Sequence, residues 1–239
     1  MIALIADLHL QAGNPATLMQ AIKFLDWATG RCERLYILGD LFEYWLGDDC
    51  PLPGLHSFEQ SLTSLSKAGC NVTIMHGNRD FLLGDSFCKS VGAQLERADT
   101  LKVKFEQRTA VLLHGDTLCT DDVAYQQARL QLRNADWQNS FLALPFEARK
   151  QQAQALRQQS KNDSAAKTED IMDVNLSAAQ HLAKQENSDL LIHGHTHRPD
   201  WHKEQKIDRV VLGDWHKDGA YVALYDKGEL SLTHWPFDR

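Results

Sequence analysis

The stretch LLIHGHTHRP, residues 190–199, decides the fold and the chemistry expected of this chain. Its first three residues are apolar and predict a short buried strand, after which a glycine allows a tight turn. Histidines stand at alternate positions of this turn: His193, His195 and His197. A neutral imidazole binds a metal ion through one ring nitrogen, so two such rings at the end of one strand can reach a common ion. The alternative interpretation is a histidine-rich surface loop.

Four other predicted strands also end in side chains that can bind a metal ion. The residues that follow the strands predicted at 2–6, 34–38, 72–75 and 110–113 are, in this order, Asp7 with His9, Asp40, Asn78, and His114. Open α/β sheets place their sites at the carboxyl ends of strands, so these side chains are expected to meet. Asp7 alone is also a good helix cap, but five strand ends of one kind are not explained as five unrelated caps.

Length, composition and charge limit the class of protein. The 239 residues are 43% hydrophobic and 24% charged, which fits one globular domain with room for an insertion. The sequence shows no apolar run long enough for a membrane span, no basic signal segment at its start, and five scattered cysteines without a CxxC pair. We therefore expect a cytoplasmic protein with reduced thiols. The net charge of -7 argues against a general nucleic-acid binder.

Residues 122–184 differ in character from the rest of the chain. They show helical periodicity, contain few β-branched residues and include one proline, Pro145. Between residues 123 and 168, seven basic and three acidic side chains give a local charge of +4. We predict that residues 1–121 and 185–239 form the core and that 122–184 form a helical cap inserted over the strand ends. The alternative is an ordinary solvated cap whose Arg and Lys side chains only keep it soluble.

The predicted ligands are all nitrogen or oxygen donors, and none is a thiolate. They are Asp7, His9, Asp40, Asn78, His114, His195 and His197. Seven side chains are too many for one tetrahedral ion and suit two ions that share a carboxylate. Two such ions promote an in-line displacement at phosphorus, because one lowers the pKa of a bound water and both neutralise the phosphoryl oxygens. The mixture of donors favours manganese, iron or zinc.

The motifs DLH, GD, GNRD, HGD and GHTH together resemble the calcineurin-like metallophosphoesterases. This resemblance implies an α/β fold of two packed, mixed β-sheets flanked by helices, with a dinuclear metal centre. It also implies which residues hold each ion. One ion would be held by Asp7, His9, Asp40 and His197, and the other by Asp40, Asn78, His114 and His195. Asp40 would bridge the two ions.

One position departs from the common pattern of that family. Many members have a histidine that helps the leaving group where this chain has Arg79. A guanidinium does not give up its proton, but it binds phosphate in a fork. The leaving group should therefore need little help from a proton. A phosphate that leaves from a pyrophosphate is such a group, whereas an alkoxide is not.

A narrower resemblance extends over nearly the whole chain. The motifs ADLHL, HGNRDFLLG, HGDTLCTDD, IMDVN and LIHGHTHRP look like those of the metallophosphoesterases that hydrolyse UDP-2,3-diacylglucosamine in lipid A biosynthesis. The resemblance implies attack on the uridine-side phosphorus, with UMP and 2,3-diacylglucosamine 1-phosphate as products and two divalent ions, expected to be Mn²⁺. It also implies a peripheral protein at the cytoplasmic face of the inner membrane. We expect no nucleic-acid partner and no obligate protein partner.

The same resemblance implies roles for individual side chains. Catalytic roles are expected for Asp40, Asn78, Arg79 and His195. Contacts with the substrate are implied for Asn78, Arg79, Asp122, Ser160, Ser164, Lys167 and His195, to which we add Tyr125 and Arg157 from the helical segment. Relatives commonly have asparagine at the position of Ser164. The apolar faces that contain Tyr125 and residues 141–146 are expected to line a chamber for the two acyl chains.

Other interpretations stay open at this point. An enzyme of the same family that acts on a soluble nucleotide, such as a dinucleoside polyphosphate or a cyclic nucleotide, would share the core but would not need an apolar insertion. A non-catalytic scaffold would have lost ligands, and this chain has all seven. Among the remaining acidic residues, Asp80 is expected to orient Arg79 by a charge pair, and Asp48 and Asp49 to lie in a solvated loop.

Overall fold

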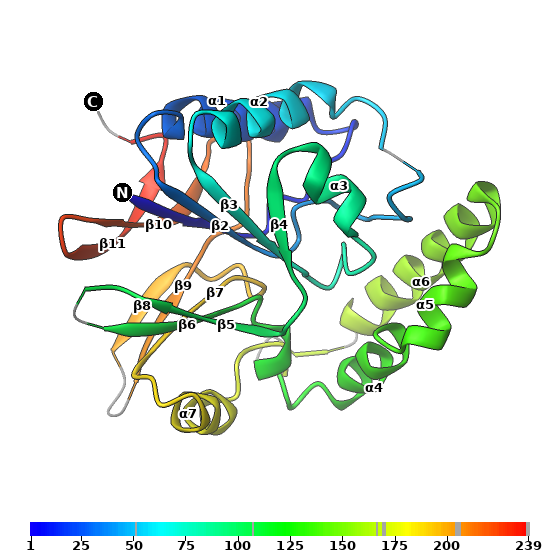
Figure 1. The fold of residues 1–239 in the computed structure, drawn as a ribbon. Helices are drawn as coiled ribbons and strands as arrows, with labels where there is room; N and C mark the ends of the chain where they lie inside the picture. Colours follow the sequence, from blue (N-terminus) through cyan, green and yellow to red (C-terminus); the bar gives the residue numbers. More distant parts are fainter. Residues whose placement is uncertain (51, 107, 166, 169–170, 204–206, 238–239) are drawn as a thin grey trace.

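Helices and two β-sheets form the layers of the body of the molecule (Figure 1). The computed structural model describes residues 1–239 except 51, 107, 166, 169–170, 204–206 and 238–239. The two sheets face each other across a shared core, to which Leu4 and Leu38 contribute from the first sheet and Leu112 and Ile192 from the second. The predicted fold class, α/β with two mixed sheets flanked by helices, is confirmed.

The first sheet has the strand order β11-β10-β1-β2-β3-β4. Its strands are β1 (Ile2–Ile5), β2 (Arg34–Leu38), β3 (Asn71–Met75), β4 (Ala93–Glu96), β10 (Ala220–Asp226) and β11 (Glu229–Trp235). Strands β1 to β4 run parallel, and β10 is antiparallel to β1. The parallel strands end on the same side of the sheet, and Asp7, Asp40 and Asn78 follow β1, β2 and β3 there.

The second sheet has the strand order β5-β6-β7-β9-β8. Its strands are β5 (Thr100–Lys104), β6 (Thr109–Leu113), β7 (Leu190–His193), β8 (Asp200–Lys203) and β9 (Asp208–Val211). Strands β6, β7 and β9 are parallel, whereas β5 and β8 are antiparallel edge strands. His114 therefore follows β6 on the same side as His195 and His197 follow β7.

Helices cover the outer faces of both sheets. Phe24, Phe58 and Phe87 belong to the core between the first sheet and its helices, and Ala179 and Ala183 belong to the core of the second. The helices of the first sheet are α1 (Pro15–Ala28), α2 (His56–Lys67) and α3 (Asp85–Ser90), and that of the second is α7 (Leu176–Gln185). The outer face of each sheet is thereby shielded from water.

Three further helices stand beside the sheets and are called the arm here (Figure 1). They are α4 (Val123–Leu132), α5 (Ala135–Leu142) and α6 (Phe146–Ala165), and the 3-10 helix η1 (Asp116–Leu118) precedes them. We expected the inserted cap to extend from 122 to 184, and this prediction is wrong for α7. Ala179 and Ala183 give α7 a face of small side chains, which lets it pack closely on Val111 and Leu191 of the second sheet.

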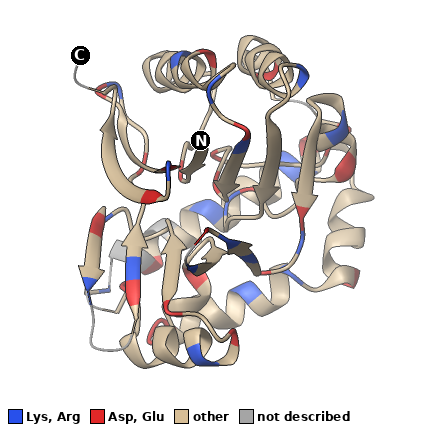
Figure 2. Ribbon diagram, turned by 60° about the vertical axis from the view of Figure 1, so that its left-hand side comes forward, with Lys and Arg blue, Asp and Glu red and all other residues tan. Residues whose placement is uncertain are grey.

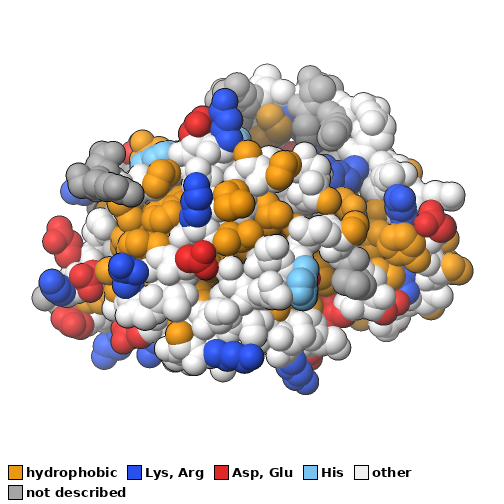
Figure 3. Space-filling model, turned by 90° about the horizontal axis from the view of Figure 1, so that it is seen from above, with side chains coloured by type: hydrophobic (Ala, Val, Ile, Leu, Met, Phe, Trp, Pro, Cys, Tyr) orange, Lys and Arg blue, Asp and Glu red, His pale blue; other side chains and the backbone are white. Residues whose placement is uncertain are grey.

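The surface carries charges of both signs. Positions of Lys and Arg and of Asp and Glu are scattered over the helices, strands and loops (Figure 2). Seen from the side of α1 and α2, a band of hydrophobic side chains crosses the molecule with charged side chains around it (Figure 3), and Met19 of α1 is 51% exposed. Within the described part of the chain, no helix combines the length and the apolar character needed to cross a bilayer.

The placement of α7 predicts the effect of enlarging its buried side chains. Ala183→Leu adds volume to a close-packed interface, so we expect the free energy of unfolding to fall by about 1–3 kcal/mol. His181→Leu introduces the same side chain at an exposed position of the same helix and should change it by less than about 0.5 kcal/mol. Urea unfolding of both variants measures the difference. Equal stability of the two variants would place α7 away from the sheet.

Candidate functional site

The backbone turns sharply where the predicted ligands leave their strands. Five of the seven non-glycine residues with positive φ in the described chain are predicted ligands. They are Asp7 (φ 54°), His9 (φ 48°), Asp40 (φ 50°), His195 (φ 69°) and His197 (φ 54°). Side chains rarely adopt this left-handed conformation, and residues held in it are concentrated at functional sites. Left-handed backbone conformations of the described chain are therefore concentrated at this cluster.

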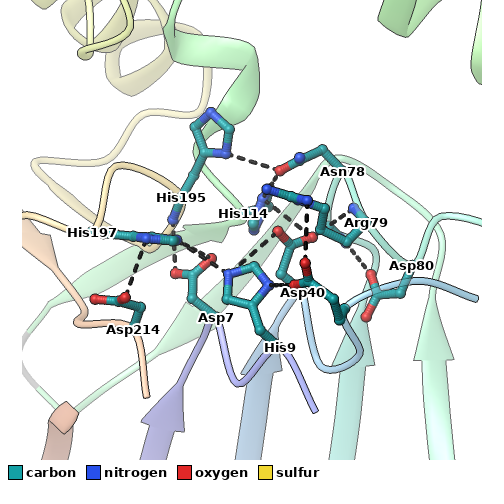
Figure 4. Close-up of polar contacts among 12 residues, drawn as sticks. Asp7, His9, Asp40, Asn78, Arg79, Asp80, His114, His195, His197 and Asp214 are labelled. Atoms are coloured by element: carbon teal, nitrogen blue, oxygen red, sulfur yellow. Dashed lines mark hydrogen bonds and ion pairs between the residues drawn. The ribbon is translucent and has the colours of Figure 1, made fainter. Parts of the chain in front are cut away.

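The turns bring three of these side chains into one group. Donor atoms of Asp7, His9 and His197 lie within 4.8 Å of one another. His9 Nε2 is 3.3 Å from His197 Nε2, and His197 Nε2 is 3.5 Å from Asp7 Oδ1 (Figure 4). Loops that follow β1 of the first sheet and β7 of the second thus contribute to the same small volume.

A second group lies directly beside the first. Donor atoms of Asp7, Asp40 and His114 also lie within 4.8 Å of one another. Asn78 Oδ1 is 2.8 Å from His114 Nε2 and 3.0 Å from His195 Nδ1. All seven predicted ligands therefore meet at the ends of the two sheets, as Figure 4 shows.

Asp40 occupies the position between the two groups. Its Oδ2 is 3.9 Å from His9 Nε2, and its Oδ1 is 3.8 Å from His114 Nε2. The Arg79 backbone N–H also donates a hydrogen bond to Asp40 Oδ1 at 2.8 Å. The side chain is 3% exposed, so water contributes little to the stabilisation of its charge.

The space around the two carboxylates is kept free by glycines. A Cβ at Gly194 would lie 2.1 Å from Asp7 Oδ2, and a Cβ at Gly77 would lie 2.0 Å from Asp40 Oδ1. Imidazole nitrogens, carboxylate oxygens and an amide oxygen are donors that suit manganese, iron or zinc. The converging donors and the room that these glycines leave fit a pair of divalent ions.

The ionisation states of His195 and Asp7 suit metal binding. Burial lowers the pKa of His195 to about 4, so its ring is neutral at pH 7 and offers a lone pair. Burial alone would raise the pKa of Asp7, but His197, His114 and His9 together lower it to about 2. The carboxylate therefore stays ionised throughout the physiological range.

The second ring nitrogen of three histidines has a partner of its own. His114 Nδ1 is 2.9 Å from the Leu38 carbonyl oxygen. His9 Nδ1 is 3.2 Å from Glu43 Oε2, and His197 Nδ1 is 3.4 Å from Asp214 Oδ2. Such partners fix the orientation of a ligating ring and its tautomer.

Sequence reasoning missed both acidic partners. Asp214 follows β9 after Leu212 and Gly213, which repeats the pattern of a strand, a glycine and an acidic residue that singled out Asp40. The pattern was therefore present but not used. Glu43 lies three residues after Asp40, and its position in the sequence carries no comparable signal.

Asp80 does not orient Arg79, so this prediction is wrong. Its Oδ2 accepts hydrogen bonds from the Leu41 and Phe42 backbone N–H groups at 2.7 and 3.3 Å, and its Oδ1 accepts one from Gly77 at 2.8 Å. Asp80 is fully buried and ties the loop after β2 to the loop after β3. The Arg79 guanidinium instead lies 3.6 Å from Glu43 Oε1.

A cavity of about 290 Å³ lies between the body and the arm, next to this cluster. The predicted contacts Asn78, Arg79, Asp122, Tyr125, Arg157, Ser160 and Lys167 line it. Apolar parts of its wall come from Phe81, Leu82, Leu132, Trp137, Phe141 and Leu156. The side chain of Ser164 lies outside the described residues. We expected Phe146 to line a chamber, but it is 44% exposed because it opens α6 on the outside of the arm.

Arginines of the arm pair with acidic residues of the body. Arg149 of α6 donates to both carboxylate oxygens of Asp49 at 2.7 and 2.8 Å, and its side chain is only 7% exposed. Arg129 of α4 donates to Asp116 at 2.7 Å. These contacts hold the arm against the body.

The prediction of a solvated loop is wrong for Asp48, whereas the Asp49 side chain is 62% exposed and also pairs with the arm. Asp48 accepts hydrogen bonds from the Gly84 and Phe87 backbone N–H groups, both at 2.9 Å, at the start of α3. Asp49 pairs with Arg149 of the arm. Both acidic side chains find partners far away in the sequence.

The sequence profile of the calcineurin-like phosphoesterases matches residues 1–199, and the chain belongs to this family. Three curated relatives are each named UDP-2,3-diacylglucosamine hydrolase. The protein from Cellvibrio japonicus (strain Ueda107) is 42% identical and aligns over 97% of both chains. That from Haemophilus influenzae (strain PittGG) is 40% identical over 93% of this chain and 94% of its own, and that from Escherichia coli O6:H1 is 41% identical over 98% of both. Within the phosphoesterases, the chain belongs with these hydrolases.

The glycine beside Asp7 provides a test of the cluster. Gly194→Ala places a methyl group 2.1 Å from Asp7 Oδ2, so we expect Asp7 to move and manganese affinity to fall at least about tenfold. Gly13→Ala is the control, because a Cβ at Gly13 meets nothing within 4 Å. Isothermal titration of chelator-treated protein with Mn²⁺ measures both affinities. Unchanged binding by Gly194→Ala would argue against Asp7 as a ligand.

Proposed function

We propose that this protein hydrolyses the pyrophosphate bond of UDP-2,3-diacylglucosamine to UMP and 2,3-diacylglucosamine 1-phosphate, a step of lipid A biosynthesis. The observation that carries this proposal is the juxtaposition of two features. A cluster of seven side chains with donor atoms for a metal lies beside a partly apolar cavity whose wall includes Arg79, Arg157 and Lys167. The names of relatives that are 40–42% identical along nearly the whole chain support the same substrate.

We propose two divalent ions as cofactors, with Mn²⁺ as the expected metal. Asp7, His9, Asp40 and His197 would hold one, and Asp40, Asn78, His114 and His195 the other. When bound, the pair lowers the pKa of a water molecule and neutralises charge on the phosphoryl oxygens. The position of Asp40 between His9 and His114 supports its role as the shared ligand.

The side chains around these ligands bind and orient the pyrophosphate. The Arg79 guanidinium faces the cavity, where it can donate two parallel hydrogen bonds to phosphoryl oxygens. It does not supply a proton to the departing group, which is acceptable because a sugar phosphate leaves as a stable anion. Asn78 and His195 lie within 3.0 Å of each other beside it and complete the proposed catalytic set with Asp40.

The cavity wall provides different surroundings for the two ends of the substrate. Arg157, Ser160, Lys167, Asp122 and Tyr125 provide charge and hydrogen bonds for the phosphate and sugar. Phe81, Leu132, Trp137, Phe141 and Leu156 provide apolar contact for acyl chains. Ser164, with its shorter side chain, completes the proposed set of contacts. A soluble nucleotide would leave the apolar part of this wall unused.

We further propose that the protein associates peripherally with the cytoplasmic face of the inner membrane. Val123 and Leu130 of α4 are 61% and 73% exposed, so the arm presents apolar side chains to its surroundings. The excess of basic residues between 123 and 168 would be attracted to anionic headgroups. A lipid substrate must be taken from such a surface.

The product that receives the oxygen of water shows which phosphorus atom is attacked. Hydrolysis of UDP-2,3-diacylglucosamine in ¹⁸O-enriched water is expected to place the label in UMP, because the lipid phosphate is the leaving group. Mass spectrometry of both products measures it. Label in the sugar phosphate would contradict attack at the uridine-side phosphorus. Turnover of dinucleoside polyphosphates without turnover of the lipid substrate would favour the soluble-nucleotide alternative.

The role of the apolar wall is tested by two variants of α4. Leu132→Asp puts a charge where an acyl chain would lie, so we expect kcat/KM for the lipid substrate to fall at least about tenfold, or about 1.4 kcal/mol. Turnover of bis-p-nitrophenyl phosphate, which has no acyl chain, should change by less than about twofold. Gln127→Asp is the control, because Gln127 is exposed on the same helix and lies outside the cavity wall. Equal losses on both substrates would refute the acyl-binding role of the cavity.

A further inference from the structure

Glu43 connects the metal cluster to the arm. Its Oε2 lies 3.2 Å from His9 Nδ1. Its Oε1 lies 3.6 Å from the Arg79 guanidinium and contacts the Arg157 guanidinium of α6. Arg157 also donates a hydrogen bond to the Glu43 backbone carbonyl oxygen at 3.2 Å. The Glu43 side chain is 15% exposed, so these partners replace most of its water.

We propose that Glu43 is a positioning residue with two tasks: it orients His9 as a metal ligand and holds Arg79 and Arg157 in place for the phosphates of the substrate. The proposal rests on the function proposed above and deepens it. Its two tasks belong to different oxygens of one carboxylate and can therefore be separated by substitution.

The first task follows from the chemistry of imidazole. The Glu43 carboxylate lies 3.2 Å from His9 Nδ1 and favours a proton on that nitrogen, which leaves Nε2 free to bind a metal ion. His9 Nε2 is the nitrogen that faces the cluster, 3.9 Å from Asp40 Oδ2 and 3.3 Å from His197 Nε2. Without the carboxylate the ring would be free to rotate or to change tautomer, and the loss of such a partner typically lowers metal affinity 10–100-fold.

The second task follows from the charges. Arg79 and Arg157 come from different parts of the chain, and their guanidinium groups repel each other when they approach the same place. One carboxylate between them reduces that repulsion and leaves a net charge of +1 toward the cavity. Both long side chains are then ordered before the substrate arrives, which lowers the cost of orienting the pyrophosphate.

A simpler role for Glu43 would be to fasten α6 to the body. The structure contains a matched contact that does only this. Asp49 lies on the same loop and pairs with Arg149 of the same helix at 2.7 and 2.8 Å. In the described part of the chain, the polar contacts of Asp49 include neither His9 nor Arg79. Removal of Asp49 therefore reports the effect of loosening α6 without the effect on the cluster.

The experiment compares three variants with the wild type by isothermal titration of the metal-free proteins with Mn²⁺ and by steady-state kinetics. Glu43→Ala is expected to weaken manganese binding about tenfold and to raise KM. Glu43→Gln retains an oxygen that accepts from His9, so manganese affinity should recover to within about threefold of wild type. The missing charge should keep KM raised. Asp49→Ala should leave manganese affinity unchanged.

Other outcomes overturn the proposal. Equal weakening of manganese binding by Glu43→Ala and Asp49→Ala would show that Glu43 acts only by fastening the arm. Wild-type manganese affinity in Glu43→Ala would exclude the orientation of His9. Thermal unfolding of each variant checks that the fold is kept. A wild-type protein that binds no manganese would instead refute the metal centre itself, and a wild-type protein that binds manganese without cleaving the lipid substrate would refute only the proposed function.

Discussion

The burial of two carboxylates at the junction of the two sheets is the constraint on which the site depends. Asp7 is 0% exposed and Asp40 is 2% exposed, so neither can be stabilised by bulk water. Burying an ionised carboxylate without compensation costs several kcal/mol. Part of the compensation comes from backbone donors: the His195 N–H donates to Asp7 at 2.8 Å and the Arg79 N–H donates to Asp40 at 2.8 Å. Nearby histidines and a bound cation pair would supply the rest.

These backbone donors also hold the loops in register. The N–H that stabilises each carboxylate belongs to a loop that carries another proposed ligand or phosphate-binding residue. Further bonds reinforce the arrangement, since the Asp7 N–H donates to the Gly39 carbonyl at 3.1 Å and the His9 N–H donates to the Asp40 carbonyl at 2.9 Å. The strained conformations of the ligands are therefore maintained by a network that links both sheets. Displacing one loop would disturb the donors of another.

The sequence predicted that the proposed ligands converge, because each of them lies within about four residues of the end of a strand. A strand's direction then determines where the next side chain emerges, and parallel strands bring such positions together. The partners of Asp80 and Asp49 were not predictable in this way. Asp80 accepts from backbone groups 38 and 39 residues earlier, and Arg149 reaches Asp49 from 100 residues away. Any acidic residue can accept such bonds, so only the folded arrangement decides which one does.

In the arm, the burial of apolar side chains was also only partly predictable from the sequence. Its helical character was evident from the sequence, but the direction of each face was not, because the polar and apolar residues of α6 are weakly separated around the helix. Phe146 was therefore expected inside and lies outside, whereas Leu156 of the same helix lines the cavity. For α7 the informative feature was small size: Ala179 and Ala183 fit against a sheet. Apolar periodicity in the sequence alone does not distinguish a helix of the arm, such as α6, from a helix that packs on a sheet, such as α7.

The loop after β2 has a consequence for how this protein and its relatives can diverge. It supplies Asp40 to the ligand cluster, Glu43 to the boundary between cluster and cavity, and Asp49 to the arm. A substitution there that suits a different lipid would alter the chemistry at the same time. Evolution of substrate range should therefore proceed through compensated, covarying pairs between this loop and α6. The exposed faces of the outer helices α1 and α2 make no such double contact in the described chain, so their residues can change without affecting the chemistry.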